Sequence, residues 1–349
     1  MKRPWTFELS PLSRRRLANF CANRRGIWAL RVFVLLLLLT LPAEFVANNR
    51  PLLVRLDGHG YCPVLRAYPE TAFGGALETE TDYTDPYVAE TLVAARGGRM
   101  LWPPVRYRYD TVDMETDRPA PAPPAPGHWL GTDDQGRDVL ARAIYGFRLS
   151  VLFGVTLTLI STVVGVLLGL WSGYSGGWVD LIFQRFMELW TSMPQLYMLI
   201  IMSSFIIPGF ASLLGLLLLF SWVSLVGLVR AETLRARNFD YIRAARALGL
   251  SGPRIALRHV LPNAMVSAMT YLPFILAGSL TTLTARDFLG LGLPPGSPSL
   301  GEMLQQGKSN LQAPWLGVTA FGVLAVMFVL VVFIGEALRD AFDPRKVVR

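Results

Sequence analysis

The stretch that decides the fold is NFDYIRAARALGLSGPRIALRHVLP, residues 238–262. It is polar and basic, yet an apolar run lies on each side of it, at residues 210–229 and 264–284. Each run has the ~20 residues that an α-helix needs to cross the hydrocarbon of a bilayer. The stretch is therefore predicted to be a loop tethered between two membrane helices. These tethers exclude a DNA-binding helix-turn-helix.

Within this loop the residues predict two short helices. Four residues follow helical spacing and form one face of the first helix: Tyr241, Ala244, Ala245 and Leu248. Asn238 is the predicted N-cap, Asp240 suits the first turn, and Gly249 suits the position where a helix stops. A second helix, capped by Ser251, is predicted to end before Pro262. Small residues on an exposed helix face allow close approach to a groove in a partner.

The composition predicts an integral membrane protein of the all-α class. The chain has 349 residues, of which 52% are hydrophobic and only 17% charged, whereas a soluble domain has about 25% charged residues. Six membrane helices are predicted, at residues 27–47, 150–172, 187–207, 210–229, 264–284 and 316–334. The third contains Pro194 and follows an amphipathic lead-in, so it is the weakest of the six.

The distribution of arginine and lysine predicts the orientation of these helices. Residues 1–26, 230–263 and 335–349 together carry 18 basic and 6 acidic side chains. Residues 48–149 carry 11 basic and 14 acidic side chains, and the loop 286–315 is neutral. Both termini and the 230–263 loop are therefore predicted to face the cytoplasm. The net charge of +8 is a topology signal and gives no support to nucleic-acid binding.

Three parts follow from this topology. Residues 1–47 are a basic cytoplasmic arm and the first membrane helix, which we favour over a cleaved signal peptide because no Ala-x-Ala site follows it. Residues 48–149 form an extracytoplasmic segment ending in a proline-rich linker and an amphipathic helix. Residues 150–349 form the membrane core. Cys21 and Cys62 then lie on opposite sides of the membrane, so we expect both to be free thiols.

Three patterns that suggest chemistry are given simpler interpretations. Residues 301–309 resemble a phosphate-binding loop, but five residues separate the glycines where four are needed. Asp133, Asp134 and Asp138 lie beside arginines, which favours paired charges on an interfacial helix over a hydrolase or Ca²⁺ site. Gly165 and Gly169 favour close helix packing over a pore. We find no metal-ligand spacing and no catalytic triad, so we predict no bound metal or cofactor and no enzymatic activity in this chain.

Several motifs together resemble the permease subunits of ATP-binding-cassette importers. The loop contains DYIRAARALG at 240–249 and HVLPN at 259–263; the other motifs are LGTD at 130–133, GRDVLAR at 136–142, GGWVD at 176–180, DFLGLGLP at 287–294, APWL at 313–316 and RDAFDP at 339–344. The general family has Glu at position 243 and Ile at position 259. The Arg and His found here are similar to the dipeptide/oligopeptide branch, and the long insert 48–127 resembles its YejE-type subfamily.

This resemblance implies a type I importer permease fold in a bacterial inner membrane, with a periplasmic insert between the first two helices. It implies transport of oligopeptides or peptide-like compounds such as microcin C. The implied partners are a second permease in a heterodimer, ATPase subunits that are separate or fused into one chain, a periplasmic peptide-binding protein and the lipid bilayer. The residues implied to contact the ATPase are Asp240, Tyr241, Arg243, Ala244, Ala245, Leu248 and Gly249.

Two other classes of function are weighed against this one. A membrane-anchored enzyme or sensor would use the 48–149 segment, but five further spans are superfluous for an anchor. An ion-coupled transporter or channel predicts charged residues in the middle of spans. The centres of the second, fourth, fifth and sixth spans contain none, which favours a pathway for neutral peptide backbones. The residues that line this pathway cannot be named from the sequence.

Overall fold

The computed structural model describes residues 11–113, 118–205 and 209–342. The chain divides into two compact units, which are described one at a time. The first comprises Met1–Val34, Leu152–Leu283 and Val326–Arg349, and the second comprises Leu35–Val151 and Thr284–Ala325. Four helices (α2, α4, α11 and α13) contribute residues to both units.

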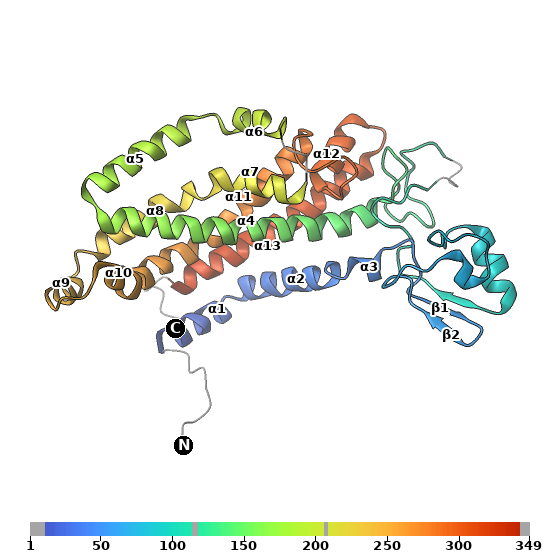
Figure 1. Cartoon of the computed structure of the whole chain (residues 1–349), viewed down its shortest axis with the longest axis horizontal. Helices are drawn as coiled ribbons and strands as arrows, with labels where there is room; N and C mark the ends of the chain where they lie inside the picture. Colours follow the sequence, from blue (N-terminus) through green and yellow to red (C-terminus); the bar gives the residue numbers. More distant parts are fainter. Residues whose placement is uncertain (1–10, 114–117, 206–208, 343–349) are drawn as a thin grey trace, which may run out of the picture. The chain divides into compact units, whose positions relative to one another are not determined.

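The first unit is built from helices (Figure 1). In chain order its elements are α1 (Pro11–Ala22), α2 (Arg24–Thr40), α4 (Val139–Ser175), α5 (Gly177–Ser192), α6 (Gln195–Ser203), α7 (Phe210–Ser221), α8 (Val223–Ala236), α9 (Asp240–Ala247), α10 (Gly252–Ile255), the π turn η4 (Ala256–Val260), α11 (Leu261–Phe288) and α13 (Pro314–Phe342).

Four helical segments among the described residues are long and apolar enough to cross a membrane. They are Val139–Ser175, Phe210–Ala236, Gly252–Phe288 and Pro314–Phe342. They contain the second, fourth, fifth and sixth predicted spans. The helical membrane-protein class is therefore confirmed, while the count of six goes beyond these four segments.

Prolines limit the helices at the other two predicted spans. In the first, α2 has 17 residues and ends at Thr40, shortly before Pro42. In the third, α5 ends at Ser192, and the nine-residue α6 starts after Pro194. Proline has no backbone N–H, and the residue before it avoids helical geometry. Residues 206 and 207 of that span lie outside the described part of the chain.

Three glycines bring α4 and α8 close together. A Cβ atom on Gly165 would lie 2.8 Å from the Trp222 carbonyl oxygen, and one on Gly169 would lie 2.8 Å from that of Val226. One on Gly173 would lie 2.8 Å from the Thr233 Cβ. Larger side chains would force the two backbones apart. The sequence interpretation of these glycines as a helix-packing face is confirmed.

The second unit contains short helices and a small sheet. Besides its parts of the long helices it includes α3 (Ala43–Val46), β1 (Leu53–Leu56), β2 (His59–Tyr61), η1 (Glu70–Phe73), the π turn η2 (Tyr87–Val93), η3 (Ala94–Arg96), β3 (Arg99–Leu101) and α12 (Leu300–Ser309). The strand order is β2-β1-β3, and both pairings are antiparallel. Val54 pairs with Tyr61 on one side and Met100 on the other.

The sheet departs from the all-α class predicted for the chain. Val54 and Leu56 on β1 are buried, while Leu53 and Arg55 are exposed. Strands of three or four residues are too short to give a clear alternating signal in the sequence. The buried strand residues pack with Phe73 and other side chains in a core of their own. The insert is therefore a folded element with its own apolar interior.

Two further expectations for residues 118–138 are wrong in detail. The proline-rich stretch does not run as a free extended linker, because Ala122 and Thr132 join it to the next segment through two hydrogen bonds of 2.8 and 2.9 Å. The amphipathic helix expected after it is an irregular loop in which Asp133 and Arg137 are buried. α4 begins only after Asp138, whose carboxylate accepts the Ala141 N–H at 2.7 Å.

Candidate functional site

The 238–262 loop folds as two short helices at the end of α8 (Figure 1). α9 begins at Asp240, one residue after an extended Phe239, which is the N-cap. The predicted N-cap, Asn238, instead donates its side-chain amide to the Leu234 carbonyl at 3.1 Å. α8 and α9 are joined by a tight turn in which Phe239 N–H bonds to the Ala236 carbonyl at 3.0 Å. This turn therefore holds α9 at the end of α8.

Gly249 ends α9 by the geometry that its position in the sequence suggests. Its φ is +79°, in the left-handed region that glycine adopts without strain. The Gly249 N–H bonds to the Arg246 carbonyl at 3.0 Å, and the Leu250 N–H bonds to the Ala245 carbonyl at 3.2 Å. These two bonds form a Schellman motif. Leu250 also packs against the same core cluster as Ala245, which fixes the turn.

α9 has one face in the core and another facing outward. Ile242 is fully buried and Ala245 is 9% exposed, and both belong to a cluster with side chains of α4, α8 and α11. Tyr241 is 48% exposed and Leu248 81% exposed. Ala244 is also exposed. Helical spacing predicted Ala245 on the same face as Tyr241, Ala244 and Leu248, but the structure places it on the buried face. Ile242, which the spacing did not single out, anchors that face in the core.

Polar contacts at α9 are few. The Asn263 side-chain amide donates to the Tyr241 hydroxyl at 2.8 Å, which ties α9 to the first turns of α11. Arg243 and Asp240 lie 4.0 Å apart, and both are exposed. Exposed pairs of this kind add less than about 1 kcal/mol to stability. Their charges therefore remain available to a partner.

The second helix of the loop continues into the membrane helix. Ser251 is its N-cap and Pro253 lies in its first turn, as the sequence predicts. The helix does not stop before Pro262, because the π turn η4 joins α10 to α11. A wide turn of this kind accommodates a position where the regular hydrogen-bond ladder is broken. α10 and α11 therefore form one continuous helical segment.

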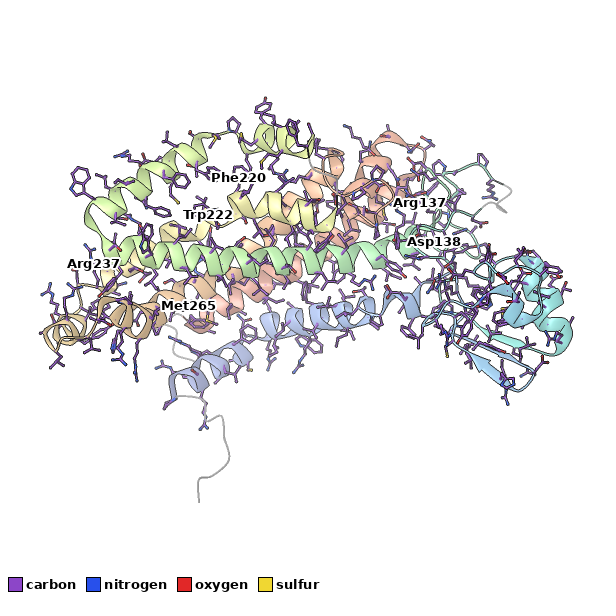
Figure 2. All side chains as sticks on the ribbon, in the orientation of Figure 1. Arg137, Asp138, Phe220, Trp222, Arg237 and Met265 are labelled. Atoms are coloured by element: carbon purple, nitrogen blue, oxygen red, sulfur yellow. The ribbon has the colours of Figure 1, made fainter. Side chains whose placement is uncertain are left out.

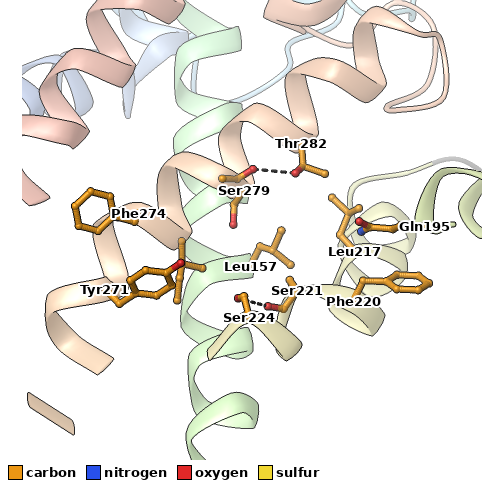
Figure 3. Close-up of a pocket in the computed structure, with 12 residues that line it drawn as sticks. Leu157, Gln195, Leu217, Phe220, Ser221, Ser224, Tyr271, Phe274, Ser279 and Thr282 are labelled. Carbon is orange, nitrogen blue, oxygen red and sulfur yellow. Dashed lines mark hydrogen bonds between the residues drawn. The ribbon is translucent and has the colours of Figure 1, made fainter. Parts of the chain in front are cut away.

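A cavity of about 280 Å³ lies among the helices of the first unit (Figure 3). It is lined by Leu157, Gln195, Leu217, Phe220, Ser221, Ser224, Tyr271, Phe274, Ile275, Gly278, Ser279 and Thr282. None of these side chains is charged, and six carry a hydroxyl or amide group. The Ser224 hydroxyl donates to the Ser221 carbonyl at 2.9 Å, and the Thr282 hydroxyl to the Gly278 carbonyl at 2.8 Å. The hydroxyl oxygens keep lone pairs that can accept hydrogen bonds.

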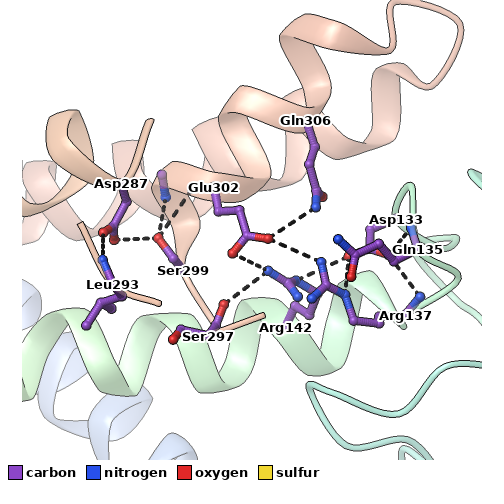
Figure 4. Close-up of polar contacts among 11 residues, drawn as sticks. Asp133, Gln135, Arg137, Arg142, Asp287, Leu293, Ser297, Ser299, Glu302 and Gln306 are labelled. Carbon is purple, nitrogen blue, oxygen red and sulfur yellow. Dashed lines mark hydrogen bonds and ion pairs between the residues drawn. The ribbon is translucent and has the colours of Figure 1, made fainter. Parts of the chain in front are cut away.

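A buried ion cluster in the second unit accounts for two of the sequence motifs (Figure 4). Arg137 Nε lies 2.7 Å from Asp133 Oδ2, and the fully buried Arg142 places Nη2 3.1 Å from Glu302 Oε2. Arg142 also donates to the Ser297 carbonyl at 3.1 Å. Two cations and two anions thus neutralise each other. The expectation of paired charges is confirmed, and the described residues contain no group of ligands suited to a metal ion.

His128 joins two carboxylates beside this cluster. Its Nδ1 lies 2.8 Å from Asp138 Oδ2, and its Nε2 lies 2.9 Å from Asp113 Oδ2. Tyr107 stacks on the imidazole with a centroid distance of 4.2 Å. Burial alone would lower the pKa of His128, but the hydrogen bonds and charges of Asp138 and Asp113 outweigh it and raise that pKa. No local sequence pattern indicates this pairing, because Asp113 lies 15 residues away from His128.

The resemblance to phosphate-binding loops has no structural basis at residues 301–309. These residues belong to the helix α12, whose N-cap is Ser299. The Ser299 hydroxyl accepts the N–H groups of Gly301 and Glu302 at 3.2 and 3.3 Å.

Cys21 and Cys62 are free thiols, as expected.

Comparison with known proteins identifies the family. The family described as "Binding-protein-dependent transport system inner membrane component" matches residues 165–348. The chain belongs to this family. The permease is 54% identical to the "Peptidoglycan transport system permease protein YejE" of Agrobacterium fabrum, with 100% of this chain and 96% of that protein covered. It is 56% identical to the "Inner membrane ABC transporter permease protein YejE" of Escherichia coli, with 97% and 99% covered.

A more distant relative matches part of the permease. The "Oligopeptide transport system permease protein OppC" of Lactococcus lactis is 38% identical over 65% of this chain and 79% of its own length. The permease is thus a multi-pass inner-membrane subunit of an ATP-binding-cassette transporter, and its family is one of non-catalytic membrane components. These matches favour the transporter interpretation over a membrane-anchored enzyme or sensor. The YejE-type resemblance seen in the sequence is confirmed.

Proposed function

We propose that the permease imports oligopeptides or peptide-like compounds as one half of a heterodimer with a second permease. ATPase subunits in the cytoplasm supply the energy, and a periplasmic peptide-binding protein delivers the cargo. The names of the relatives support the peptide class. The uncharged cavity supports it too, since hydroxyl and amide groups can exchange hydrogen bonds with a peptide backbone.

We further propose six membrane crossings with both termini in the cytoplasm, as in the type I importer fold. α2 supplies the first crossing, because its 17 residues span about 26 Å at 1.5 Å per residue. A Cβ on Gly26 would overlap the Ala337 side chain, so the start of α2 packs tightly against α13. That packing supports a retained helix. α5 and α6 contribute to the third crossing.

The outward face of α9 is the proposed docking surface for the ATPase. The observation that carries this proposal is the exposure of Leu248, a large apolar side chain that is 81% exposed beside Tyr241 and Ala244. An exposed apolar side chain on a rigid, core-anchored helix is suited to a groove in a partner. Asp240, Arg243 and Gly249 flank this surface. Ala245 supports it from within the core.

We also propose that the cavity of the first unit forms one section of the cargo pathway.

The folded insert is the proposed contact for the binding protein. The insert at residues 48–127 has its own apolar core, so it can present a fixed surface. Deletion of residues 48–127 should weaken docking of the binding protein to the assembled complex. Unchanged docking would rule out this role.

The experiment that tests the docking surface is purification of the tagged permease with its partners. The wild-type chain should retain an ATPase and a second permease in stoichiometric amounts. Gly249→Trp should lose ATPase stimulation, because no atom of the described residues beyond its two chain neighbours lies within 4 Å of a Cβ at Gly249, so the new ring would project into the partner.

Gly249→Ala is the matched control, since its Cβ meets the same strain at φ +79° but adds no ring. It should keep most of the stimulation. Wild-type stimulation in Gly249→Trp would exclude this surface as the docking site. A wild-type chain that purifies without an ATPase would exclude the importer function itself.

A further inference from the structure

Asp180 and Arg230 form an ion pair that the docking surface does not include. The Arg230 Nε lies 2.6 Å from Asp180 Oδ1, and its Nη2 lies 2.6 Å from Oδ2. The Ser172 hydroxyl donates to Asp180 Oδ1 at 2.5 Å. The Asp180 side chain is 12% exposed and that of Arg230 is 27% exposed. A bidentate pair fixes both distance and orientation, unlike a single contact between flexible side chains.

This ion pair joins α8 to the corner between α4 and α5. Asp180 lies in the first turn of α5, directly after the corner between α4 and α5. Arg230 lies on α8, seven residues before Arg237, and therefore on the same face of the helix. Arg237, which is labelled in Figure 2, donates its Nη1 to the Gly173 carbonyl at 3.2 Å. Arg230 of α8 and Arg237, the C-cap of that helix, thus hold the start of α5 and the end of α4.

α8 leads from this corner to the docking surface without a flexible link. Only residues 237–239 separate α8 from α9, and all three N–H groups bond to carbonyls of α8 at 3.0 to 3.3 Å. Ile242 of α9 then packs into the same cluster as Val229 of α8. A displacement of α9 must therefore move α8, and Arg230 with it.

α5 leads from the same corner to the cavity. A row of aromatic rings (Trp171, Phe183, Phe186, Trp190, Phe220 and Trp222) packs α5 against α4 and the α7–α8 junction, with neighbouring centroids 5.5 to 6.5 Å apart. The Trp190 indole also donates to the Leu219 carbonyl at 3.0 Å. Gln195, just beyond Pro194 at the far end of α5, lines the cavity. α5 is thus braced along its length between the ion pair and the cavity.

We propose that Asp180 and Arg230 are positioning residues that carry the movement of α9 to α5, and through α5 to the cavity wall at Gln195. This inference rests on the proposed docking of an ATPase at α9. Neither residue touches the ATPase or the cargo. They act by keeping the α4–α5 corner at a fixed position against α8 while the docking helix moves.

The test uses the complete importer in lipid nanodiscs and proteoliposomes, with Asp180→Asn as the main variant. Asparagine preserves the size of the side chain and removes its charge. We expect Asp180→Asn to retain its partners and its basal ATP hydrolysis. Peptide transported per ATP hydrolysed should fall by about tenfold, within the range that coupling between sites commonly spans.

The matched control is Glu188→Gln on the same helix. Glu188 pairs with Arg185 at 2.6 Å, but both side chains are more than half exposed. Its removal should leave the ratio of transport to hydrolysis unchanged. Asp180→Arg alone should abolish transport, and the exchange Asp180→Arg with Arg230→Asp should restore part of it. A brace that only maintains the fold would lower assembly and hydrolysis together with transport.

Distances between spin labels, measured by electron paramagnetic resonance, report the movement itself. Spin labels at Arg246→Cys on α9 and Leu189→Cys on α5, in a background with Cys21→Ser and Cys62→Ser, should report one concerted change on ATP binding. Each distance is measured to a label on the second permease. In Asp180→Asn the α9 distance should still change, while the α5 distance should not.

A normal transport ratio in Asp180→Asn, or an α5 distance that still follows α9, would overturn the proposal. If the wild-type complex shows no ATP-dependent change at α9, that result refutes the proposed docking of the ATPase at α9. The two failures are thus distinguishable.

Discussion

Leu248→Ala provides the sharpest test of the docking surface, because the side chain contributes little to the isolated chain. Leu248 is 81% exposed, so most of its apolar surface is in water until a partner covers it. Fully burying a leucine side chain is worth about 1.5–3 kcal/mol, so covering the exposed part is worth about 2 kcal/mol. Since 1.4 kcal/mol is tenfold in affinity, we expect the Kd for the ATPase to rise about 30-fold.

The assay is titration of the purified ATPase onto the permease heterodimer in nanodiscs, with thermal unfolding of the same sample as a second measurement. Ile242→Ala is the contrasting variant on the same helix, because Ile242 is fully buried. It should destabilise the fold by about 2–5 kcal/mol. Leu248→Ala should leave the melting temperature unchanged. An unaltered Kd in Leu248→Ala, or a loss of stability equal to that of Ile242→Ala, would refute the reasoning.

Three further predictions concern the helix contact, the ion cluster and the histidine. Gly169→Leu should destabilise the permease by more than about 1–3 kcal/mol, because its Cβ alone would lie 2.8 Å from the Val226 carbonyl oxygen. Gly215→Leu should not, because no described atom outside its own helix backbone and its chain neighbours lies within 4 Å of a Cβ there; thermal unfolding compares the two variants. Asp133→Asn should destabilise by about 3–5 kcal/mol, because it leaves buried arginines with one carboxylate, and the exposed Asp134→Asn should melt like the wild type. The pKa of His128 is raised in the folded chain, so its stabilisation is complete below about pH 6.5 and is lost as the pH rises through the raised value. Hydrogen exchange of residues 128–138, corrected for intrinsic rates, should therefore be slower at pH 6 than at pH 8, and this difference should vanish in His128→Asn but persist in His59→Asn.

The sequence predicted features that depend on local chemistry or on long apolar runs. Gly249 as a helix stop follows from the backbone geometry required there, and Ser251 occupies the predicted N-cap position although its side chain makes no capping hydrogen bond. The packing role of Gly165 and Gly169 follows from their size. Four of the spans were visible because ~20 apolar residues have no other stable location.

Features that depend on tertiary contacts were not predictable in the same way. Helical spacing placed Ala245 on the outward face, but the fold buries it because Ile242 beside it anchors α9 in the core. The small sheet has strands too short to show a period. Ion pairs such as Arg142–Glu302 and Arg230–Asp180 join residues 160 and 50 positions apart, and only the fold determines which acid meets which arginine. The cavity combines residues from five helices.

The π turn at Ala256–Val260 has a consequence for the rotational register of the loop. A π turn contains one residue more than an α turn, which is equivalent to a single-residue insertion in the helix. Deleting one residue there would restore a regular α-helix and turn α10 by about 100° around the axis of α11, while the turn at residues 237–239 would still hold α9 to α8. Residues 248–251 would then have to join α9 to a helix in a different rotational register. One extra residue in the π turn thus matches the second helix of the loop to the position at which the first helix ends.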